Sequence, residues 1–418
     1  MQHQNMTPVA RRPVSKGVRM IDQETTTKEL DRRKFLTKAG IGVAGFAAGS
    51  AIIAACGSDD DAGPSTTAAP ATTAAPTTTS VALASGGPEL EWEMGTSWPT
   101  ALVTLFGSAQ MFGEEVGRLT DGRFKINVRP AGEIVGGLEV LPTVRDRGME
   151  MGHTADYYWV GLSPVHQLST AVPFGLTQRQ HNAWLYMGGG LEALRRFYAE
   201  EHNLIFFPCG GTGVQMGGWF TKEINTVDDI RGLKMRIPGI SGKVFAALGG
   251  EQISIAGGEI LPAIETGAID AAEFVGPTDD LILGLDQFAG TLYYYHPGWW
   301  EPGTSVNVLL SLDLWNELPP QYQAAIDNAA TATNLKTTAM YDNLNQRDLQ
   351  KVKEFAQIRE FSPELMKAFK AETEIVLNDV AAGDAAFAEI YEPWKVFRDG
   401  IAEWHGLAER SYLMQQTA

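Results

Sequence analysis

Cysteine is scarce in this sequence, which has only Cys56 and Cys209 among 418 residues. If one of them is consumed by a lipid, as argued below, the chain has no disulfide framework and its fold depends on an apolar core. Hydrophobic residues make up 44% of the chain. This is enough for one large two-lobed body or for two domains of ordinary size.

Positive charge is also in short supply. The chain has 33 Lys and Arg against 50 Asp and Glu, a formal net charge of -17. A phosphate backbone would be repelled by this mean field, so the composition argues against nucleic acid as a partner.

The common signatures of catalysis are missing as well. After residue 56 the sequence has no Cys-x-x-Cys, His-Glu-x-x-His, Walker loop or Gly-x-Ser-x-Gly, and no two histidines lie at metal-ligand spacing. The residues therefore favour a protein that is not an enzyme. An exported hydrolase or lyase stays open as an alternative, and so does a scaffolding lipoprotein without a small ligand.

The N-terminal segment has the pattern of an export signal. Twin arginines in Asp31–Leu36 precede an apolar, Gly/Ala-rich run over Ala39–Ala55, and the small residues of Ile53–Ala55 lead into Cys56. This predicts a twin-arginine lipoprotein signal over 1–56, with Cys56 lipidated. The alternative is a membrane-spanning anchor, but the run is weakly hydrophobic and short for a span of about 20 residues. Either Met1 or Met20 is the start.

A linker and a globular body follow. Residues 57–88 are rich in Thr, Ala and Pro, which predicts a disordered linker. From 89 onward, short apolar strands alternate with amphipathic helices, the pattern of an α/β protein. The strands expected in the first half of the body are Leu90–Met94 and Phe124–Val128, and the helices are Leu102–Thr120 and Leu138–Arg147.

The alternation restarts near Gly213, so we predict two α/β lobes with a ligand cleft between them, as in periplasmic binding proteins. Thr291–Leu310 is long enough to cross from one lobe to the other as a hinge strand. After Asp313 the pattern is helical to the end, with long helices at Leu365–Val380 and Ala385–Trp404. The expected division is lobe I over 89–212 and 301–340, and lobe II with the C-terminal helices over 213–300 and 341–418.

Five stretches in this order resemble one family, the extracytoplasmic solute receptors of tripartite ATP-independent periplasmic (TRAP) transporters. They are Pro130–Val135, Gly213–Phe220, Gly232–Gly239, Ala271–Pro277 and Gly298–Gly303. The similarity extends over about 89–392, and the pattern is most similar to the receptors for 2-oxo acids and related monocarboxylates.

The resemblance implies roles for particular residues. Arg236 matches the arginine that holds the ligand carboxylate, and a guanidinium suits a planar carboxylate because it donates two parallel hydrogen bonds. Gln215 and Glu273 match the side chains that hold a bound cation, sodium or calcium, with hard oxygens. Phe274 stands where those receptors have tryptophan. If that position gives its main-chain carbonyl to the cation, the change is tolerable, although it alters the pocket wall.

Two aromatic clusters are ambiguous. Tyr158, between Tyr157 and Trp159, either lines the cleft or belongs to the core, and Trp300 and Glu301 beside Trp299 pose the same choice. We take Tyr158, Trp300 and Glu301 as candidate ligand contacts.

The resulting hypothesis is a lipid-anchored, periplasmic receptor that captures a small carboxylic acid, such as pyruvate or a related 2-hydroxy acid, without a catalytic cofactor. It would deliver the acid to the small and large membrane subunits of the transporter. A dicarboxylate or a sulfonate is the alternative ligand. The long C-terminal helices fit a homodimer, but they equally fit packing on their own lobe.

Overall fold

The computed structural model describes residues 87–288 and 290–416. The predicted signal at 1–56, with Cys56, and nearly all of the predicted linker lie outside these residues. No helix in the described ranges is both long and apolar enough to cross a membrane.

The first of two sheets has the strand order β2-β1-β3-β10-β4. Strands β2 and β3 run parallel to β1, whereas β10 is antiparallel to both β3 and β4. We call this sheet and the helices packed on it the first lobe. Its strands are β1 (Leu90–Thr96), β2 (Phe124–Arg129), β3 (Met151–Thr154), β4 (Leu204–Gly211) and β10 (Ser305–Ser311), and its main helices are α2 (Leu105–Leu119), α3 (Val140–Arg145), α4 (Val165–Thr170), α5 (Gln178–Met187) and α6 (Gly190–His202).

Strand β4 shows why both faces of this sheet are covered. Its side chains alternate between two apolar clusters: Phe206 packs with α6, and Phe207 packs with α2 and α11 (Pro320–Val352). Pro208 fits within it because β4 is an edge strand, where a missing N–H costs least. Cys209 is fully buried, which raises the pKa of its thiol well above the ordinary value.

The second sheet has the order β11-β9-β5-β8-β6-β7. We call it, with its helices, the second lobe. Its strands are β5 (Gly218–Phe220), β6 (Lys234–Arg236), β7 (Glu251–Ile253), β8 (Ala271–Ala272), β9 (Tyr293–His296) and β11 (Gln357–Glu360), and its helices are α7 (Gly239–Ala247), α8 (Ile260–Glu265) and α9 (Pro277–Ile282). Strand β11 corrects the expectation of unbroken helix after Asp313, because it pairs in parallel with β9.

The expected hinge strand over 291–310 is wrong as one continuous strand. It consists of β9 in the second sheet and β10 in the first, separated by a segment from 297 to 304 that is not a strand. The chain does pass between the lobes here. Helix α11 also spans them, because it packs against β4 and α2 at one end and α9 at the other.

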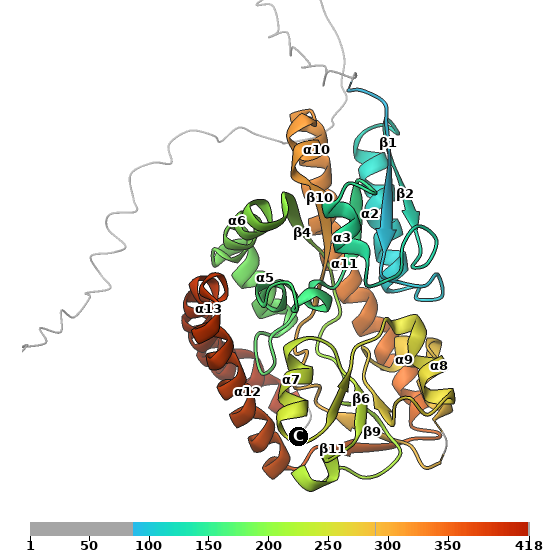
Figure 1. The fold of residues 1–418 in the computed structure, drawn as a ribbon, viewed down its shortest axis with the longest axis vertical. Helices are drawn as coiled ribbons and strands as arrows, with labels where there is room; N and C mark the ends of the chain where they lie inside the picture. The colour runs from blue at the N-terminus through green and yellow to red at the C-terminus, as the bar shows by residue number, and fades with distance from the viewer. Residues whose placement is uncertain (1–86, 289, 417–418) are drawn as a thin grey trace, which may run out of the picture. The chain divides into compact units, whose positions relative to one another are not determined.

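Two long helices near the C-terminus, α12 (Pro363–Gly383) and α13 (Ala385–His405), lie along one side of the body in Figure 1, and the short helix α14 (Ser411–Gln416) follows them. Ser362 caps α12 through the N–H of Leu365 at 3.1 Å, and Asp384 caps α13 through the N–H of Phe387 at 2.8 Å. Helix α12 packs on α7 of the second lobe, while α13 packs on α4, α5 and α6 of the first. The domain boundaries expected from the sequence stay a prediction.

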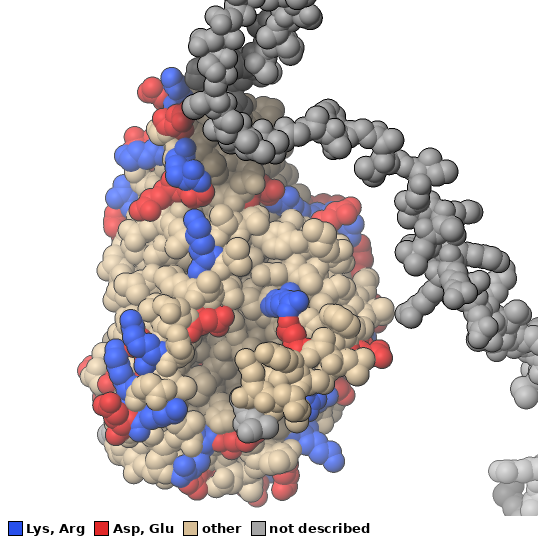
Figure 2. Space-filling view, turned by 180° about the vertical axis from the view of Figure 1, so that it is seen from behind, with Lys and Arg blue, Asp and Glu red and all other residues tan. Residues whose placement is uncertain are grey.

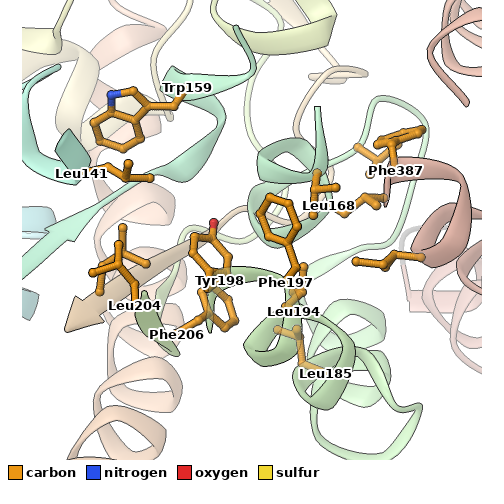
Figure 3. Packing of buried hydrophobic residues seen from close by; sticks show 14 of the residues in the cluster. Leu141, Trp159, Leu168, Leu185, Leu194, Phe197, Tyr198, Leu204, Phe206 and Phe387 are labelled. Atoms are coloured by element: carbon orange, nitrogen blue, oxygen red, sulfur yellow. The ribbon is translucent and has the colours of Figure 1, made fainter. Parts of the chain in front are cut away.

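The face of the body seen in Figure 2 carries Lys and Arg interspersed with Asp and Glu, without a broad patch of one sign. In the core of the first lobe, Tyr198 stacks on Phe206 with ring centroids 5.2 Å apart (Figure 3). A separate apolar cluster contains Trp98 and Tyr157 of the first lobe together with Trp219 and Phe274 of the second. The lobes therefore share a core where they meet.

Candidate functional site

The three residues matched most closely to the resembled family lie at one edge of the second sheet. Arg236 ends β6, Glu273 follows β8, and Gln215 precedes β5, and these three strands are neighbours. Strand β6 runs parallel to β8 while β5 runs antiparallel to it, so the carboxyl ends of β6 and β8 meet the start of β5. Ligands of α/β proteins commonly bind at such carboxyl ends.

Arg236 and Glu273 form a buried ion pair. Nη1 of Arg236 lies 2.5 Å from Oε1 of Glu273, and both side chains are 1% exposed. The same nitrogen donates to the Glu273 carbonyl at 3.1 Å, and Nε donates to the carbonyl of Ile255 at 3.2 Å. Nη2 is buried and, among the described residues, has no hydrogen-bond partner. The two parallel hydrogen bonds expected from Arg236 to a ligand carboxylate stay a prediction, and Nη2 is the nitrogen that has no bond within the described chain.

Burial and neighbouring charge work in opposite directions at this pair. Burial raises the pKa of Glu273 well above its ordinary value, and Arg236 counteracts that rise. Glu301 and Asp280 add negative charge nearby and raise the pKa of Glu273 further. Ionising Glu273 together with its acidic neighbours would exceed the charge that Arg236 alone balances, and an additional cation would favour the ionised forms.

Gln215 has a fixed environment around its amide nitrogen. Nε2 lies 2.6 Å from Oε2 of Glu301, 3.1 Å from Oγ1 of Thr304 and 3.2 Å from Oγ1 of Thr212. The amide oxygen, Oε1, is buried and lacks a partner in the described chain, and so does Oε2 of Glu273. Thr212 and Thr304 were missed by sequence reasoning, although Thr304 directly follows the matched stretch that ends at Gly303.

Glu301 adjoins both Arg236 and the tyrosines. Burial raises its pKa to about 7, and the rise is opposed by a hydrogen bond from Thr304, by the charge of Arg236 and by a hydrogen bond from Tyr157. Burial likewise raises the pKa of Tyr158, which Arg236 opposes. The structure thus brings Tyr158 and Glu301 to the same place as Arg236.

Trp300 and Phe274 have mixed surroundings. Trp300 is 1% exposed and packs edge-on against Trp299 in the aromatic core of the second lobe, with ring centroids 5.1 Å apart. Its indole N–H is nonetheless buried without a partner in the described ranges. The ring of Phe274 lies 5.4 Å from Cζ of Arg236, so the residue that replaces tryptophan packs against the guanidinium.

Trp98 and His153 form the first-lobe wall. Trp98 donates from Nε1 to Nδ1 of His153 at 2.8 Å, and Nε2 of His153 lies 3.3 Å from the Cys209 carbonyl. Burial lowers the pKa of His153 to about 4, so the ring is neutral at pH 7 and donates from Nε2. The ring of Trp98 lies 6.5 Å from that of Tyr158. This network fixes the ring of Trp98 beside Tyr158, the tyrosine whose pKa responds to Arg236.

Two polar contacts join the lobes around the site. The side chain of Gln167 in α4 accepts from the N–H of Ile240 at 2.7 Å, at the start of α7. Thr104, just before α2, donates to Oδ1 of Asp279 in α9 at 2.5 Å. Both contacts are buried and hold the two lobes together.

The unpartnered atoms define what the site can bind. Nη2 of Arg236 is a charged donor, whereas Oε1 of Gln215 and Oε2 of Glu273 are hard acceptors. Within 87–288 and 290–416, no three His, Cys, Asp or Glu side chains gather as metal ligands. The donor set is one carboxylate with an amide oxygen, which fits sodium or calcium better than a transition metal.

Comparison with known proteins agrees with this architecture. A model of the bacterial extracellular solute-binding proteins, family 7 (DctP), matches residues 94–384. The monocarboxylate 2-oxoacid-binding periplasmic protein of Nostoc sp. strain PCC 7120 is 46% identical over 332 residues, 79% of this chain and 90% of that protein.

Two solved structures are similar over most of the chain. A TRAP transporter solute-binding protein from Bordetella bronchiseptica, a dimer with calcium and picolinate in one site, is 38% identical with a TM-score of 0.77 and covers 79% of this chain and 98% of its own. A TRAP periplasmic solute-binding protein from Pseudoalteromonas atlantica with bound sodium and pyruvate is 33% identical with a TM-score of 0.75, covering 78% and 99%.

Proposed function

Because this chain belongs to family 7 of the bacterial extracellular solute-binding proteins, we propose that it captures a 2-oxo monocarboxylate such as pyruvate together with a cation. The resemblance to TRAP receptors is confirmed, and the chain is an extracytoplasmic receptor of that class and not an enzyme. The observation that carries the ligand proposal is the trio of buried, unpartnered atoms: Arg236 Nη2, Gln215 Oε1 and Glu273 Oε2.

The trio gives each part of the ligand a partner. Nη2 of Arg236 donates to the ligand carboxylate in a charge-assisted hydrogen bond. Gln215 and Glu273 would hold the cation, and the main-chain carbonyl of Phe274 is a further candidate. A bound cation supplies the positive charge that Arg236 alone lacks against Glu273 and an anionic ligand.

Selectivity for a small acid follows from burial. Tyr158 and Trp98 stand on the first-lobe side, and the ring of Phe274 packs on Arg236 from the second. We expect a single carboxylate with an adjacent oxo or hydroxyl oxygen to satisfy both the arginine and the cation. A dicarboxylate or a sulfonate is the alternative ligand. It would need a further donor for its additional oxygens.

A thermal-shift screen of residues 57–418 tests the proposal. The acids are pyruvate and other 2-oxo acids, 2-hydroxy acids, dicarboxylates and sulfonates, each with sodium, with calcium and with a chelator. A ligand at 100 times its Kd adds about 2.7 kcal/mol to the free energy of unfolding, which is readily seen. Pyruvate should raise the melting temperature only when a cation is present. Stabilisation by a dicarboxylate or sulfonate alone contradicts the proposed ligand.

We also propose a lipid anchor at Cys56, supported by the small residues that precede it and by the family's extracytoplasmic location. Cys56→Ser should move the exported protein from the membrane fraction to the soluble fraction, and Arg33→Lys should reduce export. Unchanged membrane attachment of the Cys56→Ser protein contradicts the anchor. The small and large TRAP permease subunits are the partners expected to receive the ligand.

A homodimer through the C-terminal helices is supported by two observations. The Bordetella relative is a dimer. Val396, Trp404, Leu407 and Tyr412 are each more than 60% exposed along α13 and the residues after it. Sedimentation velocity should show a dimer that Trp404→Glu dissociates, while Val103→Glu at an exposed site on the first lobe does not. A monomer at all concentrations contradicts this proposal.

A further inference from the structure

We propose that Glu301 is a positioning residue for the cation site: it holds the Gln215 amide in the one orientation that presents Oε1 to the cation. The inference rests on the proposed function and assigns Glu301 a different part from the direct ligand contact that the sequence predicted. It concerns the orientation of one amide group, which neither burial nor family membership determines.

The surroundings of the amide nitrogen carry the inference. Of the three acceptors around Nε2, Oε2 of Glu301 is the nearest at 2.6 Å. Oε2 of Glu301 accepts from Oγ1 of Thr304 at 2.7 Å and lies 2.6 Å from Nε2, so this oxygen is an acceptor on both sides and the amide face toward it is the NH₂ group. A flipped amide would place two oxygens against each other without a hydrogen between them. Oε1 is therefore directed away from Glu301, where it is buried and, in the described ranges, unpartnered.

Thr304 and Thr212 complete the same arrangement. Oγ1 of Thr304 donates to Oε2 of Glu301 at 2.7 Å, and Oγ1 of Thr212 donates to the Gly213 carbonyl at 3.1 Å. Each hydroxyl hydrogen is thereby used elsewhere, which leaves the hydroxyl lone pairs facing Nε2 of Gln215. Oε2 of Glu301 accepts from Gln215 and Thr304 together, so this oxygen is occupied by protein donors.

The main chain holds Gln215 from the same segment. Its N–H donates to the Glu301 carbonyl at 3.2 Å, and its carbonyl accepts from the N–H of Gly298 at 2.9 Å. A Cβ at Gly298 would lie 2.6 Å from the Gln215 carbonyl oxygen, so this close approach requires glycine. The segment from 298 to 304, which connects β9 with β10, thus fixes both the backbone and the side chain of a proposed cation ligand.

The experiment compares Glu301→Gln with Glu301→Met in the full chain, by titrating calcium at saturating pyruvate and measuring the melting temperature without either. Glutamine keeps an oxygen that accepts from Nε2, so calcium affinity should stay within about threefold of the parent. Methionine has similar length but no such acceptor, and calcium affinity should fall about 10- to 100-fold, as is typical when the partner of a metal ligand is lost.

A double-mutant cycle separates positioning from direct contact. In a Gln215→Met background there is no amide to orient, so Glu301→Met should cause no further loss of calcium affinity. Equal losses in Glu301→Gln and Glu301→Met overturn the inference, because the charge would then act directly. The inference is also overturned if the losses of calcium affinity add in the double mutant, or if Glu301→Met binds calcium as tightly as the parent.

Different results would overturn the proposed function and the positioning role of Glu301. A parent protein without any cation-dependent binding of pyruvate overturns the proposed function, whereas a normal parent with an unaffected Glu301→Met overturns only the positioning role. If Glu301→Met does not fold, Thr304→Val provides the test. It removes one acceptor of Nε2 and the donor to Glu301, and calcium affinity should fall about tenfold. An affinity equal to the parent's would then overturn the inference.

Discussion

Replacing Arg236 with lysine tests the binding site most directly, because it keeps the charge and changes only the geometry. In the parent, Nη1 donates to Glu273 and Nε donates to the Ile255 carbonyl, so Nη2 is the nitrogen that our proposal assigns to the ligand. A lysine has a single nitrogen. The nearby carboxylate of Glu273 would hold that ammonium, and the ligand carboxylate would lose its charged donor.

The magnitude follows from burial. Arg236 and Glu273 are both 1% exposed, so water cannot replace the missing donor. Removing one partner of a buried charge pair typically costs about 3 to 5 kcal/mol. At about 1.4 kcal/mol per tenfold, pyruvate should bind roughly a hundred to several thousand times more weakly. We expect Arg236→Lys to be nearly as defective as Arg236→Ala.

Isothermal titration of residues 57–418 with pyruvate, in sodium and in calcium, measures this loss. Arg359→Lys is a matched control, because Arg359 is a half-exposed arginine of the second lobe that pairs with Glu223 at 3.3 Å. The control should bind as the parent does. Pyruvate affinity of Arg236→Lys within about threefold of the parent would refute the assignment of Arg236 to the carboxylate.

Three further predictions concern the cation, pH and closure. Glu273→Gln should weaken pyruvate binding by about 2 to 5 kcal/mol and make it insensitive to calcium, and calorimetry that still shows calcium dependence contradicts this. Burial raises the pKa of Asp156 to about 7, above its unfolded value, so its contribution to stability is present at low pH and is lost as pH rises from about 4 through 7. Asp156→Asn should make the melting temperature less dependent on pH across that range, because it removes a pH-dependent contribution on the order of 4 kcal/mol to the free energy of unfolding. A pH dependence of the melting temperature equal to the parent's would contradict this. Thr104→Val removes the hydrogen bond to Asp279 between the lobes, and faster pyruvate release with about 1.5 to 3 kcal/mol weaker binding is expected; an unchanged release rate speaks against a role in closure.

The fold class followed from the alternation of strands and helices, whereas the three candidate site residues came from the family resemblance. Gln215, Arg236 and Glu273 each adjoin a short apolar strand, and those strands turn out to be neighbours in the second sheet. Alternating strands and helices imply such a sheet edge, but they do not indicate which residues lie on it.

Features that depend on contacts between distant segments of the chain could not be predicted from the sequence. The hydrogen bonds of Glu301 and Thr304 with Gln215 join residues about ninety positions apart, and no local sequence pattern indicates them. The hinge strand over 291–310 was expected to be continuous because the segment is rich in Tyr, Val and Trp and long enough to cross between the lobes. Its middle, 297–304, contains two prolines and two glycines, and it leaves one sheet before β10 joins the other. Strand β11 was missed because four residues between two long helices give too short a pattern to show a period of two.

The C-terminal helices restrict how far the lobes can separate. Phe369 near the start of α12 stacks on Trp299 in the second lobe, with centroids 4.3 Å apart, whereas Leu377 near its end packs in the first-lobe core with Trp394 of α13. A helix of 21 residues does not stretch, so it acts as a rigid strut anchored at both ends. Separation of the lobes must break the packing of α12 on one lobe or turn about the junction at Asp384. The helix therefore limits the amplitude of the motion, and we expect it to slow ligand exchange.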